Sequence, residues 1–376
     1  MVDWLRLRYN KRTNRPFLVR EGEPMEEDLL QLLSPQPRRL RVIENILRGR
    51  RSEATLFWAY NYHILGMLGA RRQLTRGQWE RMIRQWEQRG WVQQADQQAW
   101  LTSAGADHLS NWQREHYQSQ FGAWAWVTNV DQYSQRLLLA LQVISEFKHQ
   151  HAHYVPVNLN EFEMQRVRQW VQALAKSDLT LIETQITQLV AQLAQHDERL
   201  AIVWTYRLIG YHLIGWTERQ AAAELAVALP EVRLMIRDTW LFMATGIAQQ
   251  GGPLAALMSD LINPRPITSS AAKTLQAYQQ GLTMEQISQR RYLKLSTVRE
   301  HLLEVAILMP NQLQMASLIP PAVLAILKQY SDQPAVTWEY DAARFPVETT
   351  VAFFYFRLYQ IMRCHQEYGD YNGSIA

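Results

Sequence analysis

Apolar residues recur at helical spacing through most of the chain from Arg38 onward. The apolar positions within 42–47 and within 182–193 each fall on one face of a helix. Period-two alternation, which marks half-buried strands, is scarce. Its one short occurrence is a pair of segments at 90–92 and 99–101, separated by the largely polar Gln93–Gln98. We therefore expect a mainly α fold with at most a small hairpin.

The segment Leu74–Leu109 has the order helix, two short strands, helix. Thr75 and Gln78 are spaced as a capping box that begins the first helix, and Gly90 ends it. A Leu-Thr-x-x-Gly run at 101–105 opens the second helix, with its threonine as the expected cap. This order is typical of winged-helix domains, in which the helix before the wing enters the DNA major groove.

The first of these helices has an apolar face and an opposite face rich in Arg and Gln. The apolar face is Trp79, Met82, Ile83 and Trp86. The candidate DNA contacts on the opposite face are Arg81, Arg84, Gln85 and Gln88. Arginine suits phosphate and guanine, and glutamine suits adenine. The alternative is a module that contacts protein and leaves these arginines as a solvated face.

A run of arginines lies upstream of this module and brackets the predicted helix Val42–Leu47. Its members are Arg38, Arg39, Arg41, Arg48, Arg50 and Arg51. The first helix of a winged helix often lies beside the DNA backbone, so Arg38, Arg39 and Arg41 are candidate phosphate contacts. A solvated charge run is the equally open alternative.

Two segments 66 residues apart share one pattern without a gap. Each has a glycine expected to stop a helix, a Thr-x-x-Gln capping box, a short helix, a turn and a second helix, which is helix-turn-helix order. In the first copy the second helix is apolar nearly all round, so we predict that it is buried scaffold. The aligned pairs are Gly215 with Gly281, Thr217 with Thr283, Gln220 with Gln286, Val227 with Leu293, Leu229 with Leu295, Val232 with Val298, Arg233 with Arg299, and Ile236 with Leu302.

The second copy is the better formed. We expect Ser296 to cap its second helix. The predicted core face is Val298, Leu302, Val305 and Met309. The predicted exposed face carries the candidate DNA contacts Lys294, Ser296, Thr297 and Arg299, together with Glu300, Leu303 and Glu304. The two glutamates would repel phosphates, although a carboxylate can accept a hydrogen bond from cytosine. Docking onto a protein is therefore an equally good role for this module.

These motifs and the polar breaks between them suggest four parts. The breaks lie near 149–160, at 249–253 and at 260–268, and the segment before residue 38 is punctuated by Asn, Gly and Pro. It holds one short helix candidate, Met25–Leu33. We predict an irregular leader at 1–37, a winged-helix domain at 38–115, a helical middle domain with the degenerate helix-turn-helix at 130–250, and a C-terminal helix-turn-helix domain with a helical tail at 268–376.

Composition agrees with a folded, mildly basic protein. The chain has 376 residues, 47% of them hydrophobic and 20% charged, with a formal net charge of +4. The single cysteine, Cys364, excludes a disulfide framework within one chain. We find no apolar leader and no apolar run of membrane-spanning length. We therefore expect a cytoplasmic, nucleoid-associated protein with no membrane partner.

Sites of catalysis or metal binding are weakly indicated. His149, His151 and His153 alternate near Glu146, but their spacing suits a zinc site poorly. Cys364 and the histidine after it are sequential neighbours with no third group to orient them. No phosphate loop, Rossmann fingerprint, nucleophile elbow or zinc-protease motif occurs. We expect no catalytic residue, no metal and no cofactor, and no enzyme activity.

The second copy resembles a known family. Its segments Thr274–Leu275, Gly281–Ile287 and Leu295–Leu303 are similar to the helix-turn-helix at the C-terminus of many RecQ-type helicases. Over its whole length the chain resembles the stand-alone YpbB-like proteins, with further support from Arg136–Glu146 and Phe345–Glu348. The resemblance implies a DNA-binding accessory protein that works with a RecQ-type helicase.

Three functions therefore compete. The first is a DNA-binding accessory protein of DNA repair or recombination, with DNA and a RecQ-type helicase as partners. The second is a sequence-specific transcription regulator, which predicts preferred sites and a symmetric dimer. The third is an adaptor whose helix-turn-helix modules dock proteins without touching DNA.

Overall fold

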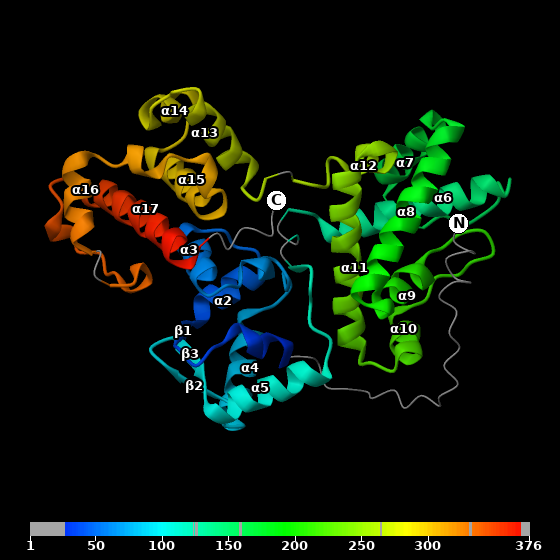
Figure 1. Ribbon diagram of the computed structural model, residues 1–376, viewed down its shortest axis with the longest axis horizontal. Helices are drawn as coiled ribbons and strands as arrows, with labels where there is room; N and C mark the ends of the chain where they lie inside the picture. The colour runs from blue at the N-terminus through cyan, green and yellow to red at the C-terminus, as the bar shows by residue number, and fades with distance from the viewer. Residues whose placement is uncertain are drawn as a thin grey trace. The chain divides into compact units, whose positions relative to one another are not determined.

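The structure is a computed structural model that describes residues 27–122, 124, 127–157, 160–263, 265–330 and 333–369. The fold is mainly α, as expected, with one small sheet (Figure 1). Most of the expected leader lies outside the described residues, and the helix expected at 25–33 is present as a 3₁₀ helix, η1 (Glu27–Leu32).

The chain forms two compact units. The first comprises 1–37, 82–94 and 100–263, and the second comprises 38–81, 95–99 and 264–376. The division therefore runs through the helix α4 (Arg76–Gln88) and through the small sheet. The four boundaries expected from the sequence stay a prediction.

The first unit is a helical layer structure built around one long helix. Its main element is α11 (Leu229–Gln250), which packs against α6, α8, α9 and α10. Besides α11, its helices are α5 (Ser103–Glu115), α6 (Val130–Lys148), α7 (Glu161–Ala173), α8 (Lys176–His196), α9 (Glu198–Arg207), α10 (Glu218–Leu225) and α12 (Gly252–Met258).

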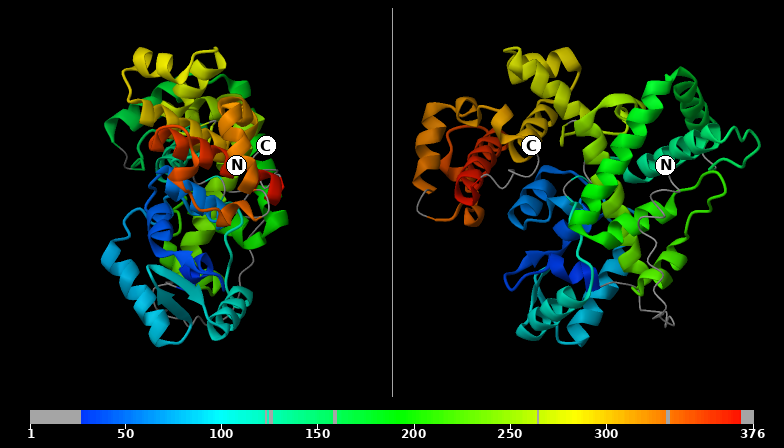
Figure 2. Two further views of the ribbon diagram at one scale, coloured as in Figure 1. Left: turned by 90° about the vertical axis from the view of Figure 1, so that its left-hand side faces the viewer. Right: turned by 45° about the vertical axis from the view of Figure 1, so that its right-hand side comes forward.

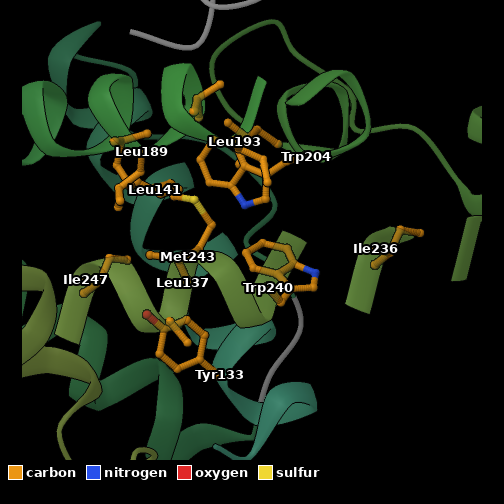
Figure 3. Packing of buried hydrophobic residues seen from close by; sticks show 14 of the residues in the cluster. Tyr133, Leu137, Leu141, Leu189, Leu193, Trp204, Ile236, Trp240, Met243 and Ile247 are labelled. Carbon is orange, nitrogen blue, oxygen red and sulfur yellow. The ribbon is translucent and has the colours of Figure 1, made fainter. Parts of the chain in front are cut away.

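The core of this unit is a single apolar cluster, in which α11 supplies residues from several faces. Trp204 of α9 and Trp240 of α11 meet edge to face with ring centroids 6.2 Å apart (Figure 3). Met243 and Ile247 continue the same buried surface. The second helix of the first helix-turn-helix copy is thus buried on several faces, as the sequence predicted.

One fully buried arginine of α6 ties this helix to α7 and to the end of α12, where it also donates to the Leu257 carbonyl. Arg136 on α6 donates to both oxygens of Glu163, at 2.6 and 2.9 Å, and its Nη1 lies 2.6 Å from a carboxylate oxygen of Asp260. These hydrogen bonds from Arg136 lower the pKa of both carboxyl groups. A buried guanidinium is stable only with such partners.

The second unit contains the chain from residue 264 onward and an N-terminal helix pair. It also holds the first residues of α4. Its further α-helices are α2 (Leu40–Leu47), α3 (Glu53–Asn61), α13 (Ser269–Gln279), α14 (Met284–Arg291), α15 (Leu295–Leu308), α16 (Pro321–Leu327) and α17 (Thr349–Tyr368). Its 3₁₀ helices are η2 (Leu65–Met67), η4 (Pro310–Gln312), η5 (Met315–Leu318), η6 (Lys328–Tyr330), η7 (Ala335–Thr337) and η8 (Ala342–Arg344).

Helix α15 is the centre of this second unit. It packs against α13 and α14 of the helix-turn-helix and also against α3 and α17. His365 of α17 links α17 to both α3 and α15. Its ring nitrogens lie 2.8 Å from the Tyr60 hydroxyl on α3 and 2.9 Å from the carbonyl oxygen of Ala306 on α15. The unbroken buried run from Leu302 to Leu308 follows from this packing on several sides.

The small sheet has the strand order β1-β3-β2, and its strands are drawn as arrows in the left view of Figure 2. Arg38 lies opposite Ala99 in an antiparallel pair. Asp96 and Gln97 form the turn, with φ of 48° and 62°, the conformation that suits two-residue hairpins. The expected strand at 90–92 was wrong in its bounds, because the turn takes only two of the polar residues. The strands are β1 (Arg38–Arg39), β2 (Val92–Ala95) and β3 (Gln98–Leu101).

The helices and the hairpin between α2 and α5 follow the order that the sequence predicted, while the winged-helix assignment itself stays a prediction. Gly90 ends α4 with a φ of 74°. A Cβ at Gly105 would overlap the carbonyl oxygen of Trp91, so only glycine allows this approach of α5. Across the described residues, no helix has both the length and the apolarity to cross a membrane.

Candidate nucleic-acid interface

Helix α4 separates an apolar face from a polar face as predicted. Its start is capped as expected: the Thr75 backbone N–H donates to Gln78 Oε1 at 2.8 Å, and the Gln78 N–H donates to Thr75 Oγ1 at 3.3 Å. The four apolar side chains of the predicted core face are all buried. The four candidate contacts Arg81, Arg84, Gln85 and Gln88 are all exposed.

Two arginines on α4 have charges that could meet a ligand. Within the described part of the chain, neither Arg81 nor Arg84 takes part in an ion pair. The acids of the same helix are engaged elsewhere, since Glu80 pairs with Arg76 at 2.7 Å and Glu87 accepts a hydrogen bond from the Gln94 amide at 2.7 Å. Among the described residues, the exposed face of α4 therefore presents Arg81 and Arg84 without an ion-pair partner, beside Glu87, whose charge the neutral Gln94 amide does not cancel.

The upstream arginines make more ion-pair and ring contacts than the sequence suggested. Arg41 and Arg48 both pair with the buried carboxylate of Glu44, at 2.7 and 2.9 Å. The Arg39 guanidinium lies 4.3 Å from the centre of the Trp58 ring. Burial lowers the pKa of Arg38, whose guanidinium lies over the Tyr62 ring. Of these candidates, Arg39 and Arg41 keep exposed side chains.

The two helix-turn-helix copies match element by element at the expected offset. Helix α10 spans 218–225 and α14 spans 284–291, while α11 begins at Leu229 and α15 at Leu295. Both Thr-x-x-Gln capping boxes form. Gly281 ends α13 with a φ of 87°, but Gly215 stops no helix, because α9 already ends at Arg207.

The N-terminus of α15 is the exposed part of the second copy. Lys294 occupies the N-cap position without a side-chain hydrogen bond, so the expectation that Ser296 caps the helix was wrong. Lys294 and Ser296 are exposed, while Thr297 and Arg299 are half-buried. The Nε of Arg299 is buried without a hydrogen-bond partner among the described residues.

The expected exposure of Leu303 and Glu304 was also wrong. Both are buried, because α15 packs against α3 and α17 as well as against its own motif. Glu304 accepts hydrogen bonds from Arg51, at 2.8 and 3.2 Å, and from the backbone and hydroxyl of Thr268, at 2.8 and 3.0 Å. It therefore holds the second unit together, and of the two glutamates only Glu300 remains on the exposed surface.

Tyr292, in the turn of the second copy, was not recognised as a functional candidate in the sequence. This residue is 96% exposed, and its φ is 52°. Its place in the turn was expected from the alignment. The exposure of a bulky aromatic side chain in a left-handed conformation required the structure.

The histidines and the cysteine that the sequence indicated only weakly as metal or catalytic residues make other contacts. The rings of His149 and Tyr211 stack with centroids 4.3 Å apart, and His151 Nδ1 lies 2.7 Å from Glu146 Oε2. No group of three potential metal ligands occurs among the described residues. Cys364 is buried, and burial raises the pKa of its thiol to about 12, so it is a poor nucleophile.

Comparison with known proteins supports the C-terminal motif. A family model described as a helix-turn-helix domain matches residues 270–360. The chain is similar to Protein YpbB of Bacillus subtilis (strain 168), with 25% identity over 173 residues. This match covers 46% of the chain and spans about half (49%) of that protein. No solved structure matches the chain. Together these findings support a DNA-binding helix-turn-helix protein similar to YpbB.

Proposed function

We propose that this protein is a DNA-binding accessory protein of DNA repair or recombination, found at the nucleoid and acting beside a RecQ-type helicase. It works by binding and catalyses no reaction of its own. The observation that carries the DNA contact is the exposed face of α4, where Arg81 and Arg84 have no ion pair among the described residues.

The chemistry of this face suits a polyanion. Its guanidinium groups lie three positions apart on one helix, which brings them to neighbouring places on one surface. Uncompensated arginines displace counterions from phosphates, and the adjoining glutamines can hydrogen-bond adenine. The opposite face is buried, so the helix offers this surface in a fixed orientation.

A second contact lies at the N-terminus of α15. Lys294 and Ser296 are exposed where the backbone N–H groups of the helix begin. The partial positive charge at a helix N-terminus favours phosphate. The C-terminal half of the helix is buried, so this contact is confined to its first turns and suits the DNA backbone better than an extended reading of bases.

The helicase link rests on the sequence resemblance of the second copy to the C-terminal motif of RecQ-type helicases. It predicts that the purified protein changes the rate at which such a helicase unwinds forked DNA. An unchanged unwinding rate, with this protein present in excess over the helicase, would remove the helicase from the proposal and leave the DNA contact intact.

The DNA contact is tested by fluorescence anisotropy with labelled duplex DNA at several salt concentrations. An Arg81→Ala/Arg84→Ala double mutant loses two phosphate contacts. We expect weaker binding and a log K against log [salt] slope that is smaller by up to about 1.8, from ~0.9 per phosphate.

An Arg199→Ala/Arg233→Ala double mutant is the matched control. It removes the same charge from arginines that are already paired with Asp197 and Glu218, and we expect wild-type binding. Equal loss in both double mutants would mean that only net charge matters and would overturn the α4 interface. No binding by the wild type at low salt would overturn the DNA function and favour the protein-docking adaptor.

A further inference from the structure

The turn of the C-terminal helix-turn-helix holds a tyrosine in an unusual state. Tyr292 is the C-cap of α14 and has φ 52° and ψ 42°. Left-handed backbone is disfavoured for any residue with a Cβ and is rare for bulky ones. The residue is nevertheless 96% exposed, so no packing against the described chain offsets this strain.

Hydrogen bonds on both sides hold the strained conformation in place. The Tyr292 N–H donates to the Gln289 carbonyl, and the Leu293 N–H donates to the Ser288 carbonyl at 3.0 Å. The Ser288 hydroxyl in turn donates to the Leu293 carbonyl at 2.6 Å. These bonds therefore fix the backbone from which the ring projects; strained residues of this kind cluster at functional sites.

The first copy shows that the turn itself does not need a ring. Ala226 occupies the same place, 66 positions earlier, with φ 53° and ψ 41°. It closes α10 in the first copy, whose second helix, α11, is buried on several faces. An aromatic side chain thus occurs only in the copy whose turn leads into an exposed helix N-terminus.

The surroundings of Tyr292 favour nucleic acid over protein. Arg290 and Lys294 flank it along the chain, both are exposed, and neither has an ion pair among the described residues. The N-terminus of α15 follows three residues later and adds partial positive charge. Aromatic rings set among cations are the means by which proteins hold unpaired bases, because every base can stack on a ring while its phosphate meets a cation.

We propose that Tyr292 stacks on an unpaired base and that this protein therefore prefers DNA with unpaired nucleotides, such as a fork or a junction of single and double strands, to plain duplex. This inference rests on the proposed DNA-binding function and names the DNA that the C-terminal motif selects. Arg290 and Lys294 contact the phosphates on either side of the stacked nucleotide.

The test measures anisotropy with labelled forked, single-stranded and duplex DNA. We expect Tyr292→Ala to weaken binding to forked and single-stranded DNA by roughly 5- to 150-fold, the range of one lost stacking contact, and to leave duplex binding unchanged. The alanine matches Ala226 of the first copy, so the turn keeps its conformation. Tyr292→Phe keeps the ring and should bind as the wild type does.

Phe147→Ala, which removes an exposed aromatic ring of the first unit, is the control and should bind every DNA normally. The fluorescence of 2-aminopurine placed at the unpaired position next to the junction gives a second readout, since stacking on Tyr292 quenches it. Wild-type binding of forked DNA by Tyr292→Ala, with wild-type quenching, overturns the inference while leaving the DNA function intact. Loss of helicase binding alone in this variant also overturns it and assigns the ring to a protein partner. Failure of the wild type to bind any DNA sinks the proposed function itself.

Discussion

Replacing Glu304 by alanine should destabilise the second unit without strengthening DNA binding. The carboxylate accepts hydrogen bonds from the Arg51 guanidinium and from the backbone and hydroxyl of Thr268. Its loss leaves the guanidinium without its charge partner. The sequence alone predicted the opposite, an exposed acid that repels phosphates, so this variant separates the two interpretations.

The magnitude follows from the burial of the two partners. Removing one member of a buried ion pair costs about 3–5 kcal/mol. The Glu304 side chain is 8% exposed and that of Arg51 is 21% exposed. Because water reaches Arg51 in part, we expect the low end, about 3 kcal/mol. With urea m values of about 1–3 kcal/mol/M, the midpoint of unfolding falls by about 1 M or more.

The assay is urea unfolding followed by far-ultraviolet circular dichroism, together with duplex DNA binding at low salt. Glu300→Ala is the control, because Glu300 is an exposed acid one turn away on the same helix. It should change stability by less than about 0.5 kcal/mol. If α15 contacts DNA, Glu300→Ala should also bind DNA more tightly, since it removes a repulsive charge.

Two results would refute this reasoning. An unchanged urea midpoint for Glu304→Ala would mean that the carboxylate is not part of the folded interior. Tighter DNA binding by Glu304→Ala than by Glu300→Ala, in a folded protein, would put Glu304 on the DNA-facing surface after all.

Three further predictions concern stability and reactivity. Arg136→Met should lower the free energy of unfolding by about 3–5 kcal/mol, measured by urea unfolding. Hydrogen bonds from Arg136 lower the pKa of both partner carboxyl groups, so the stability that these groups contribute in the wild type should be complete above about pH 5 and fall as the pH drops through and below their unfolded-state pKa values near 4. An acid-unfolding midpoint identical in wild type and variant would contradict this. Gly105→Ala should lower the free energy of unfolding by about 1–3 kcal/mol through its clash with the Trp91 carbonyl oxygen. Gly77→Ala, in a helix with open space around it, should raise the free energy of unfolding by up to about 1 kcal/mol. Equal urea midpoints for the two variants would argue against the close approach of Gly105 to Trp91. Cys364 should resist iodoacetamide at pH 8 in the native protein and react after unfolding, as measured by mass spectrometry, because burial raises the pKa of its thiol to about 12.

Local features of the fold were readable in the sequence because they depend on residues a few positions apart. The capping boxes at Thr75, Thr217 and Thr283 need only a partner three residues later, and all of them form. The buried and exposed faces of α4 follow from helical periodicity, and the 66-residue offset reproduces the bounds of α10 and α14. The exposure of Arg81 and Arg84 was predictable on the same basis.

Tertiary packing decided which helix faces meet a second neighbour. Periodicity identifies one apolar face of α15, but packing against α3 and α17 also buries Leu303 and Glu304. The partner of Glu304 is Arg51, 253 residues away, and no local pattern relates two such positions. The exposure of Tyr292 likewise depends on what the folded chain leaves uncovered. Sequence spacing therefore determined the helices and their primary faces, whereas long-range contacts decided which charges remain free to meet a ligand.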